Sequence, residues 1–277
     1  MSNDEIIASH YSGGSLLEVI KNGLAKLNKT PANVSTEDLG PVDEFHTGGR
    51  IATKALLDQL ALAPSDHVLD VGCGLGGSSR YTVVEYGCRV TGIDLTPEFI
   101  ETGRTLNEWV GLDQQIQLDV ASATDLPLDT PRFNHAFMLH VGMNIADKLA
   151  LMVNVFNALE PGGSFAVYDM MRTGDAELEL PVPWASDPAA NAIAAPEIYR
   201  DAFAKAGFEL IAERNRKEFA EEFFAKVKAQ NADRGGPPAL GIHLLMGPEA
   251  PVKVKNILQC MSAGGIAPFE MIGRKPG

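Results

Sequence analysis

The amino-acid sequence predicts an α/β fold built on a mostly parallel β-sheet, and two observations support this prediction. Short apolar runs that suit buried strands alternate with longer segments whose apolar residues recur at helical spacing. The first of these runs leads directly into a glycine-rich turn and a helix start. Right-handed crossovers then place helices on both faces of one sheet. The strands of this alternating core are predicted at residues 67–71, 89–94, 116–120, 135–140 and 163–170.

Further elements precede this core. Leu16, Ile20 and Leu24 belong to an apolar face that predicts an amphipathic helix over residues 14–28. We expect this helix either to cover a binding site or to mediate a homodimer. A second helix is predicted from about Gly48 to Leu62, ending before a Pro-Ser-Asp turn.

The elements after the core follow the same kind of pattern. They are a Pro- and Ala-rich connection at 173–196, a helix at about 196–206, a strand at 208–214, helical segments over 216–263 broken at 235–238, and a final strand at 269–275.

The length and composition favour one large domain with additions. A chain of 277 residues with 45% apolar residues can bury one α/β core and does not need two complete domains. We expect an N-terminal helical cap at 1–62, a ligand-binding domain at 63–214 and 266–277, and a helical insertion at 215–265 between the last two strands.

The segment HVLDVGCGLGGSSR, from His67 to Arg80, carries most of the functional information. Its glycines remove Cβ atoms where the chain must turn sharply after a buried strand, so a ligand can approach the main chain closely. The helix that starts near Gly76 adds free N–H groups and the positive end of its dipole. A nucleotide-like cofactor is therefore expected here.

Two carboxylates favour one cofactor over another. The pattern Gly72-x-Gly74-x-x-Gly77 also fits a dinucleotide fingerprint, but Asp70 would repel a pyrophosphate and suits the ammonium of an amino-acid moiety. Asp94 ends the second strand 22 residues after Gly72, where it is expected to accept the ribose hydroxyls. Its charge argues against NADP. S-adenosylmethionine, which carries an ammonium beside a sulfonium, fits this pattern.

Four motifs together resemble those of class I S-adenosylmethionine-dependent methyltransferases over roughly residues 65–170. They are DVGCGLGG (70–77), GIDLT (92–96), TDLPL (124–128) and LEPGG (159–163). A narrower resemblance links the chain to bacterial ubiquinone/menaquinone-biosynthesis-like and sarcosine/dimethylglycine-like small-molecule methyltransferases. It rests on EFHTGGRIAT (44–53), HVGMNIADK (140–148), LPVPWA (180–185) and AGF (206–208).

The resemblance implies a Rossmann-like seven-stranded sheet whose last strand is antiparallel, with S-adenosylmethionine as cofactor. One departure is that Ser122 stands where relatives often carry an acidic residue near the adenine. The adenine contact would then fall to the Ala123 backbone or to Asp125. The expected cofactor-binding residues are Asp70, Gly72, Cys73, Gly74, Asp94, Leu95, Ser122, Ala123 and His140.

Methyl transfer from a sulfonium is an in-line displacement, so the protein mainly aligns the acceptor and excludes water. A hydroxyl or carbon acid also needs a base, which favours histidine. His140 follows the fourth strand at its carboxyl end, and the resemblance places the segment of His46 over the methionine end of the cofactor. Either could instead be structural, His140 bonded to a carbonyl and His46 capping a helix.

The expected acceptor contacts are more scattered along the chain. Arg50 suits a substrate carboxylate, and Trp184 suits a ring or a cation, although a solvated arginine and a packed tryptophan are the simpler alternatives. His243 lies in the late insertion, where packing within the cap is the alternative to closing the same pocket. The full set of expected acceptor-binding residues is Phe45, His46, Arg50, Asn144, Trp184 and His243.

Charge and cysteine content narrow the function classes. A formal charge of −13 and a pI near 4.9 disfavour a nucleic-acid substrate, so a small-molecule methyl acceptor is expected. Three distant cysteines form neither a disulfide framework nor a metal-site spacing, and no basic leader or membrane-spanning apolar run is present. We expect a cytoplasmic protein without a metal.

Two other functions remain alternatives at this point. An NAD-dependent oxidoreductase is disfavoured by Asp70, and Tyr168 is not followed by a lysine four residues later. A non-catalytic protein that retained the cofactor fold is compatible with the sequence, because a fold does not establish a function.

Overall fold

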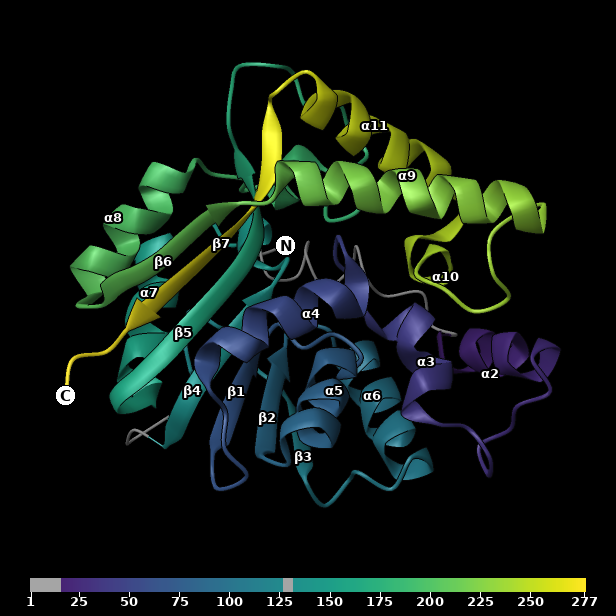
Figure 1. Cartoon of the computed structure of the whole chain (residues 1–277), viewed down its shortest axis with the longest axis horizontal. Helices are drawn as coiled ribbons and strands as arrows, with labels where there is room; N and C mark the ends of the chain where they lie inside the picture. The colour runs from purple at the N-terminus through teal and green to yellow at the C-terminus, as the bar shows by residue number, and fades with distance from the viewer. Residues whose placement is uncertain (1–15, 127–131) are drawn as a thin grey trace.

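A seven-stranded sheet forms the centre of the molecule (Figure 1). The computed structural model describes residues 16–126 and 132–277. The strand order is β3-β2-β1-β4-β5-β7-β6, and β7 runs antiparallel to both of its neighbours, as predicted. The strands are β1 (His67–Val71), β2 (Arg89–Asp94), β3 (Ile116–Val120), β4 (Phe133–Leu139), β5 (Leu159–Arg172), β6 (Glu209–Asn215) and β7 (Ile266–Arg274).

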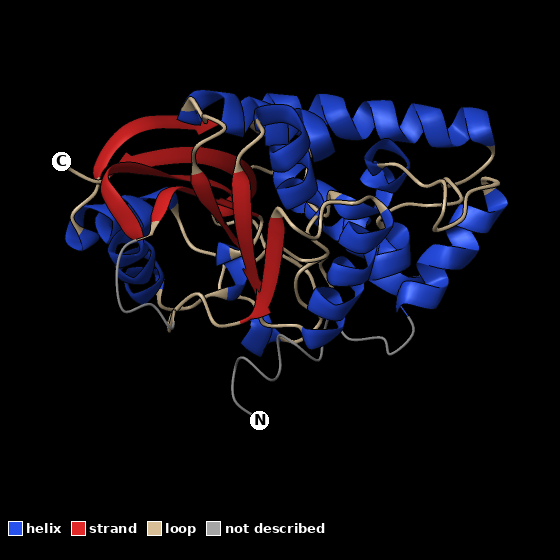
Figure 2. Cartoon of the chain, turned by 90° about the horizontal axis from the view of Figure 1, so that it is seen from below, coloured by secondary structure: helices blue, strands red, loops and turns tan. Residues whose placement is uncertain are grey.

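Helices cover both faces of this sheet (Figure 2). On one face α7 (Lys148–Ala158) and α8 (Pro196–Ala206) share a core with Leu69 and Val71. On the other face α4 (Gly49–Leu57), α5 (Gly77–Tyr86) and α6 (Pro97–Trp109) pack with Val68. The alternation of neighbouring β1 residues between the two cores explains why the strand is apolar nearly throughout.

The N-terminal helices differ from the prediction in two places. The helix predicted from Gly48 to Leu62 is split, because α4 gives way to a 3-10 turn at Asp58–Leu60 and Ala61 then adopts a left-handed conformation. A further helix, α3 (Thr36–Asp43), was not predicted. It contains Pro41 and few apolar residues, so periodicity does not reveal it, although Ser35 and Asp38 form a capping box at its start.

Segments from opposite ends of the sequence form a cap beside the carboxyl ends of the strands. The helix predicted at 14–28 is α2 (Leu16–Lys26), its first residues lying outside the described part of the chain. The segment between β6 and β7 contains α9 (Lys217–Arg234), α10 (His243–Met246) and α11 (Ala250–Ser262). α10 contacts α2 and α3 (Figure 1), and Leu240 is buried in one cluster with Ile20 and Leu24. The apolar face of α2 is thus covered within the chain.

A buried ion pair holds the N-terminal segment on the core. Arg80 donates from Nη2 to Asp43 Oδ1 at 2.5 Å and from Nε to Asp43 Oδ2 at 3.2 Å, and both side chains are fully buried. Its Nη1 donates to Asn107 Oδ1 at 2.7 Å, which adds α6 to the junction. Gly77 permits this approach, because a Cβ there would lie 2.3 Å from the Asp43 Cβ.

The described helices include none that combines the length and apolar character needed to cross a membrane.

We predict that Asp43→Asn lowers the free energy of unfolding by about 3–5 kcal/mol, because it leaves the Arg80 charge buried without a counter-ion. Guanidinium denaturation without ligand measures this change. The matched control is Lys54→Ala, which removes the exposed Lys54–Asp58 pair and should leave the denaturation midpoint nearly unchanged. Equal midpoints for the Asp43 variant and the native protein would show that the buried pair does not stabilise the fold.

Candidate functional site

A cavity of about 310 Å³ opens at the carboxyl ends of β1, β2 and β4. This is the position at which open α/β sheets bind ligands. All nine residues predicted to bind the cofactor line this cavity. They are Asp70, Gly72, Cys73, Gly74, Asp94, Leu95, Ser122, Ala123 and His140.

The glycine turn is held close to the sheet by backbone geometry. Gly72 has φ of +72°, and a Cβ there would lie 2.3 Å from a methyl carbon of Val141. The N–H groups of Gly72 and Cys73 both donate to the carbonyl of Ile93, and that of Gly74 donates to Asp94. Because these three donors are engaged within the protein, the turn is not arranged as a pyrophosphate cradle.

Asp94 is positioned by the main chain around it. Its Oδ2 accepts from the Gly74 N–H and its Oδ1 from the Thr96 N–H, both at 2.9 Å. Burial raises the pKa of Asp94, and these backbone donors oppose the rise. Each carboxylate oxygen retains acceptor capacity for a ligand hydroxyl.

Asp70 is a buried carboxyl group at the floor of the cavity, with 2% of its surface exposed. Ser79 Oγ donates to its Oδ2 at 2.6 Å. Burial raises the pKa of Asp70 to about 7, the carboxylates of Glu44 and Asp94 add to the rise, and the Ser79 bond opposes it. A cationic group beside Asp70 would offset the desolvation of the charged carboxylate by pairing with it.

The opposite wall of the cavity comes from the loop after β3. Ser122 Oγ lies 3.0 Å from Thr124 Oγ1, and an isolated bridge pairs Ser122 with Asp125. Ala123 is buried in this turn and lines the cavity, as does Phe99 from α6. Pro127 and Leu128, the last residues of the TDLPL motif, lie outside the described residues.

A second, smaller cavity of about 60 Å³ adjoins the first. Phe45, His46 and His140 line both cavities and form the boundary between them. Most of its other lining residues are apolar and come from the β5 region and the cap: Met143, Met170, Pro183, Trp184, Phe223, Phe224, Ile242, Met246, Val254 and Ile257.

His46 belongs to a buried hydrogen-bonded group at this boundary. Its Nε2 lies 3.1 Å from the Gly49 carbonyl, which can only accept, so Nε2 carries the proton and Nδ1 carries the lone pair in the neutral ring. Thr53 Oγ1 lies 3.0 Å from Nε2 and donates to Glu44 Oε2 at 2.7 Å. Glu44 Oε2 is 3.5 Å from His46 Nε2. Burial lowers the pKa of His46, and the Glu44 charge opposes this by favouring the imidazolium.

His140 follows β4 in a left-handed conformation with φ of +55°, which is uncommon for a residue other than glycine. Its backbone N–H donates to the Tyr168 carbonyl at 2.7 Å. Its Nε2 and the Tyr168 hydroxyl are both buried, and neither has a hydrogen-bond partner among the described residues. Burial and the neighbouring His46, with ring centroids 6.0 Å apart, hold the pKa of His140 well below its usual range.

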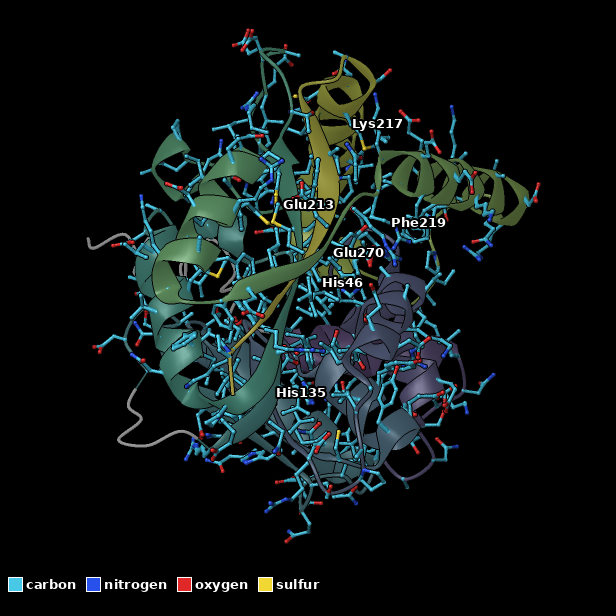
Figure 3. All side chains as sticks on the ribbon, turned by 60° about the vertical axis from the view of Figure 1, so that its left-hand side comes forward. His46, His135, Glu213, Lys217, Phe219 and Glu270 are labelled. Atoms are coloured by element: carbon cyan, nitrogen blue, oxygen red, sulfur yellow. The ribbon has the colours of Figure 1, made fainter. Side chains whose placement is uncertain are left out.

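Other histidines lie elsewhere. His46 lies near the centre of the molecule (Figure 3), whereas His135 lies toward the amino end of β4 and is 3.8 Å from Asp66. His243 lies in α10 and, like Arg50, lines neither of the two cavities among the described residues. Arg50 donates to the Thr36 carbonyl at 3.1 Å and lies 3.6 Å from Glu44.

Asn144 and Trp184 are linked to each other. Asn144 Nδ2 donates to the Trp184 carbonyl at 2.7 Å and to the Ala190 carbonyl at 3.0 Å. The Trp184 indole N–H donates to Asn191 Oδ1 at 3.0 Å, and its ring packs among buried apolar residues. Asn144 therefore ties the connection after β5 to the loop that carries His140.

Sequence reasoning missed Glu44, Tyr168, Phe223 and Phe224 as site residues. Glu44 opens the EFHTGGRIAT motif at residues 44–53. Its partners Thr53 and Ser78 belong to other elements, so no local pattern indicates its role. No group of three or more His, Cys, Asp or Glu side chains suited to a metal ion occurs within residues 16–126 and 132–277.

Comparison with known proteins identifies the central segment. Residues 68–163 match the family model described as a methyltransferase domain. The chain is 27% identical over 175 residues to a sarcosine/dimethylglycine N-methyltransferase of Halorhodospira halochloris, covering 63% of each chain. It is 33% identical over 127 residues to phosphoethanolamine N-methyltransferase 1 of Arabidopsis thaliana, covering 46% of this chain and 26% of that protein. The matches thus span less than two thirds of these relatives.

A solved structure shares the fold over nearly the whole chain. Geranyl diphosphate C-methyltransferase from Streptomyces coelicolor A3(2), solved with Mg²⁺, geranyl diphosphate and S-adenosyl-L-homocysteine, superposes with a TM-score of 0.66 at 16% identity. The superposition covers 99% of both chains.

We predict that Asp70→Asn changes how stability depends on pH. The folded pKa of Asp70 is about 7 against an ordinary 3.8, so the native fold binds a proton that the unfolded chain releases, and stability falls as pH rises through this window. Asparagine does not ionise. Relative to the native protein, the variant should therefore gain stability between pH 4 and pH 8, by at most about 4 kcal/mol. Urea denaturation of both proteins across this range measures the gain, and parallel pH profiles would contradict the raised pKa.

Proposed function

Because the chain belongs to the class I S-adenosylmethionine-dependent methyltransferase family, we propose that it transfers a methyl group from S-adenosylmethionine to nitrogen, oxygen or carbon of a small metabolite. One observation carries the proposal: a cavity with one buried and one partly buried carboxylate at the strand ends, Asp70 and Asp94, meets an apolar cavity at a pair of histidines. The first cavity suits the cofactor, and the second suits the acceptor.

The carboxylates of the first cavity support the cofactor assignment. Asp94 has acceptor capacity for ribose hydroxyls, and Asp70 gains a cationic partner if the ammonium end lies beside it. The pyrophosphate of NAD would instead meet both carboxylates and a turn whose donors are largely engaged. Leu95, Phe99 and Ala123 supply apolar surface for the adenine ring.

The histidines at the boundary would supply the base for an acidic acceptor. In the neutral ring, His46 Nδ1 is available to take a proton, and Glu44 stabilises the imidazolium that forms. His140 would contribute a second imidazole, whose Nε2 has no hydrogen-bond partner in residues 16–126 and 132–277. A methyl donor of this kind arrives already activated, so alignment and exclusion of water account for the rest of catalysis.

The cap would exclude water from the transferred methyl group. We propose that residues 1–62 and 215–265 act as caps on the domain formed by 63–214 and 266–277. Phe45 from the first cap and Phe223 and Phe224 from the second line the smaller cavity, which supports this division.

Location and assembly belong to the same proposal. We place the protein in the cytoplasm, supported by three cysteines that are all free and buried. A homodimer remains a prediction. Because the apolar face of α2 packs against Leu240 of its own chain, a dimer would need another surface.

The cofactor assignment predicts that Asp94→Ala weakens S-adenosylmethionine binding about tenfold to hundredfold, because a partly buried charged acceptor is lost. Titration calorimetry measures the affinity, and Asp113→Ala, on the exposed turn before β3, is the matched control that should keep it. Unchanged affinity in a folded Asp94 variant would refute the placement, and tighter binding of NAD than of S-adenosylmethionine to the native protein would refute the function.

The base assignment predicts that His46→Gln and His140→Gln lower kcat, by about 10²–10⁴ for whichever histidine takes the proton, and leave cofactor affinity nearly intact. Turnover is measured with labelled S-adenosylmethionine and a panel of metabolites. Full turnover in both variants would show that neither histidine is needed as a base and that catalysis rests on alignment alone.

Glu44→Gln separates a positioning role from a merely structural one. The Glu44 charge raises the pKa of His46, so its removal should lower that pKa further and move the acid limb of the kcat–pH profile to lower pH. A drop in kcat without movement of the limb would indicate that Glu44 only supports the fold.

A further inference from the structure

The smaller cavity has a composition that bears on the methyl acceptor. Among its described lining residues there is no aspartate, glutamate, lysine or arginine, and the polar side chains are His46, Thr47, His140 and the indole N–H of Trp184. The Trp184 N–H already donates to Asn191. A ligand in this cavity would therefore meet mainly apolar surface, and the remaining polar side chains it could reach are those of Thr47, His46 and His140, none of which carries a fixed charge.

The cations near this cavity have partners of their own. Lys253 Nζ donates to the Met246 carbonyl at 3.3 Å, and Arg216 pairs with Glu270 and lies over the Phe219 ring. The two histidines do not replace these cations, because burial lowers the pKa of each ring and favours its neutral form. A carboxylate or phosphate buried here would have no counter-ion, which is strongly unfavourable.

A positively charged acceptor is also disfavoured in the smaller cavity. Asp43, Asp70 and Asp94 line the larger cavity and not the smaller one. Glu44, 3.5 Å from His46, lines neither cavity, and its Oε2 already accepts from Thr53 and Ser78. The aromatic rings of Phe45, Trp184, Phe223 and Phe224 are mixed with methionine and aliphatic side chains, so the wall is apolar surface more than an aromatic cage.

We propose that the methyl acceptor is an uncharged, largely apolar molecule that presents one weakly acidic hydroxyl to His46 and His140. This inference rests on the proposed function and narrows its substrate class. The apolar body would occupy the smaller cavity, and the hydroxyl would lie at the boundary, in reach of both the base and the methyl group. The hydroxyl proton passes to His46 Nδ1, the oxygen forms the new bond to the methyl carbon, and the sulfur–carbon bond of the cofactor breaks.

The class differs from that of the relatives matched in sequence. Sarcosine and phosphoethanolamine carry a carboxylate and a phosphate, and each would need a cation that the described lining of the smaller cavity lacks. Different residues of this chain therefore determine which cofactor and which acceptor the two cavities suit.

Three phenols of similar size test the proposal: para-propylphenol, which is uncharged, para-hydroxyphenylacetate, which is an anion, and tyramine, which is a cation. Their affinities for the full chain saturated with S-adenosylhomocysteine are measured by calorimetry, and their methylation is followed from labelled cofactor. The uncharged phenol should bind at least about tenfold more tightly than either charged one and should be methylated. Equal or tighter binding of a charged phenol, or no binding of the uncharged one, overturns the proposal.

Variants at Met246, which lines only the smaller cavity, provide the matched test. Met246→Lys should reverse the preference toward para-hydroxyphenylacetate, whereas Met246→Gln, similar in length and uncharged, should not. S-adenosylhomocysteine affinity close to that of the native protein shows that each variant is folded. Unchanged preference in the lysine variant counts against this cavity as the acceptor site.

The proposed methyl transfer and the proposed acceptor class can be refuted independently. Methylation of sarcosine or phosphoethanolamine without any binding of the uncharged phenol would overturn the acceptor class and leave methyl transfer standing. Absence of S-adenosylmethionine binding to the native protein would overturn both.

Discussion

The buried ion pair between Arg80 and Asp43 determines how the N-terminal segment lies on the sheet domain. Arg80 lies in the helix that follows the glycine turn, and Asp43 ends α3, so the pair joins that helix to the segment that contributes Asp43, Phe45 and His46 to the cavity lining. A charge at this depth is strongly unfavourable without its partner. The next residues, Glu44 to His46, are therefore held over the boundary between the two cavities, and the position of the candidate base depends on this junction.

Desolvation shifts the pKa of buried groups in both parts of the site. Burial raises the pKa of Asp70, in the larger cavity, to about 7, and lowers the pKa of His46 and His140 at the boundary. In the free protein, burial therefore disfavours the charged form of all three groups. Burial destabilises the charged Asp70 carboxylate in the free protein and thereby favours a cationic ligand beside it. Such a ligand would offset the unfavourable desolvation of the carboxylate.

The two cavities are built from different parts of the chain. The larger one is formed mainly by the ends of parallel strands and the turns that follow them, which are local features of an α/β domain. The smaller one takes Phe45 from the N-terminal segment, Trp184 from the connection after β5, and Phe224 from the segment between β6 and β7. Changes in those connections would therefore alter the lining of the smaller cavity and leave the strand-end residues of the larger one in place.

The amino-acid sequence was sufficient to predict the parallel sheet and the strand-end positions of Asp70, Asp94 and the glycine turn, and the family resemblance added the antiparallel last strand. These features are encoded within single strand–turn–helix units, where spacing along the chain equals position in space. The three-dimensional arrangement was needed to find that Glu44 lies beside His46, that Arg50 and His243 line neither cavity, and that the smaller cavity is apolar. These features bring together residues far apart in sequence, such as Phe45 and Phe224 in the lining of one cavity, and no local periodicity indicates them.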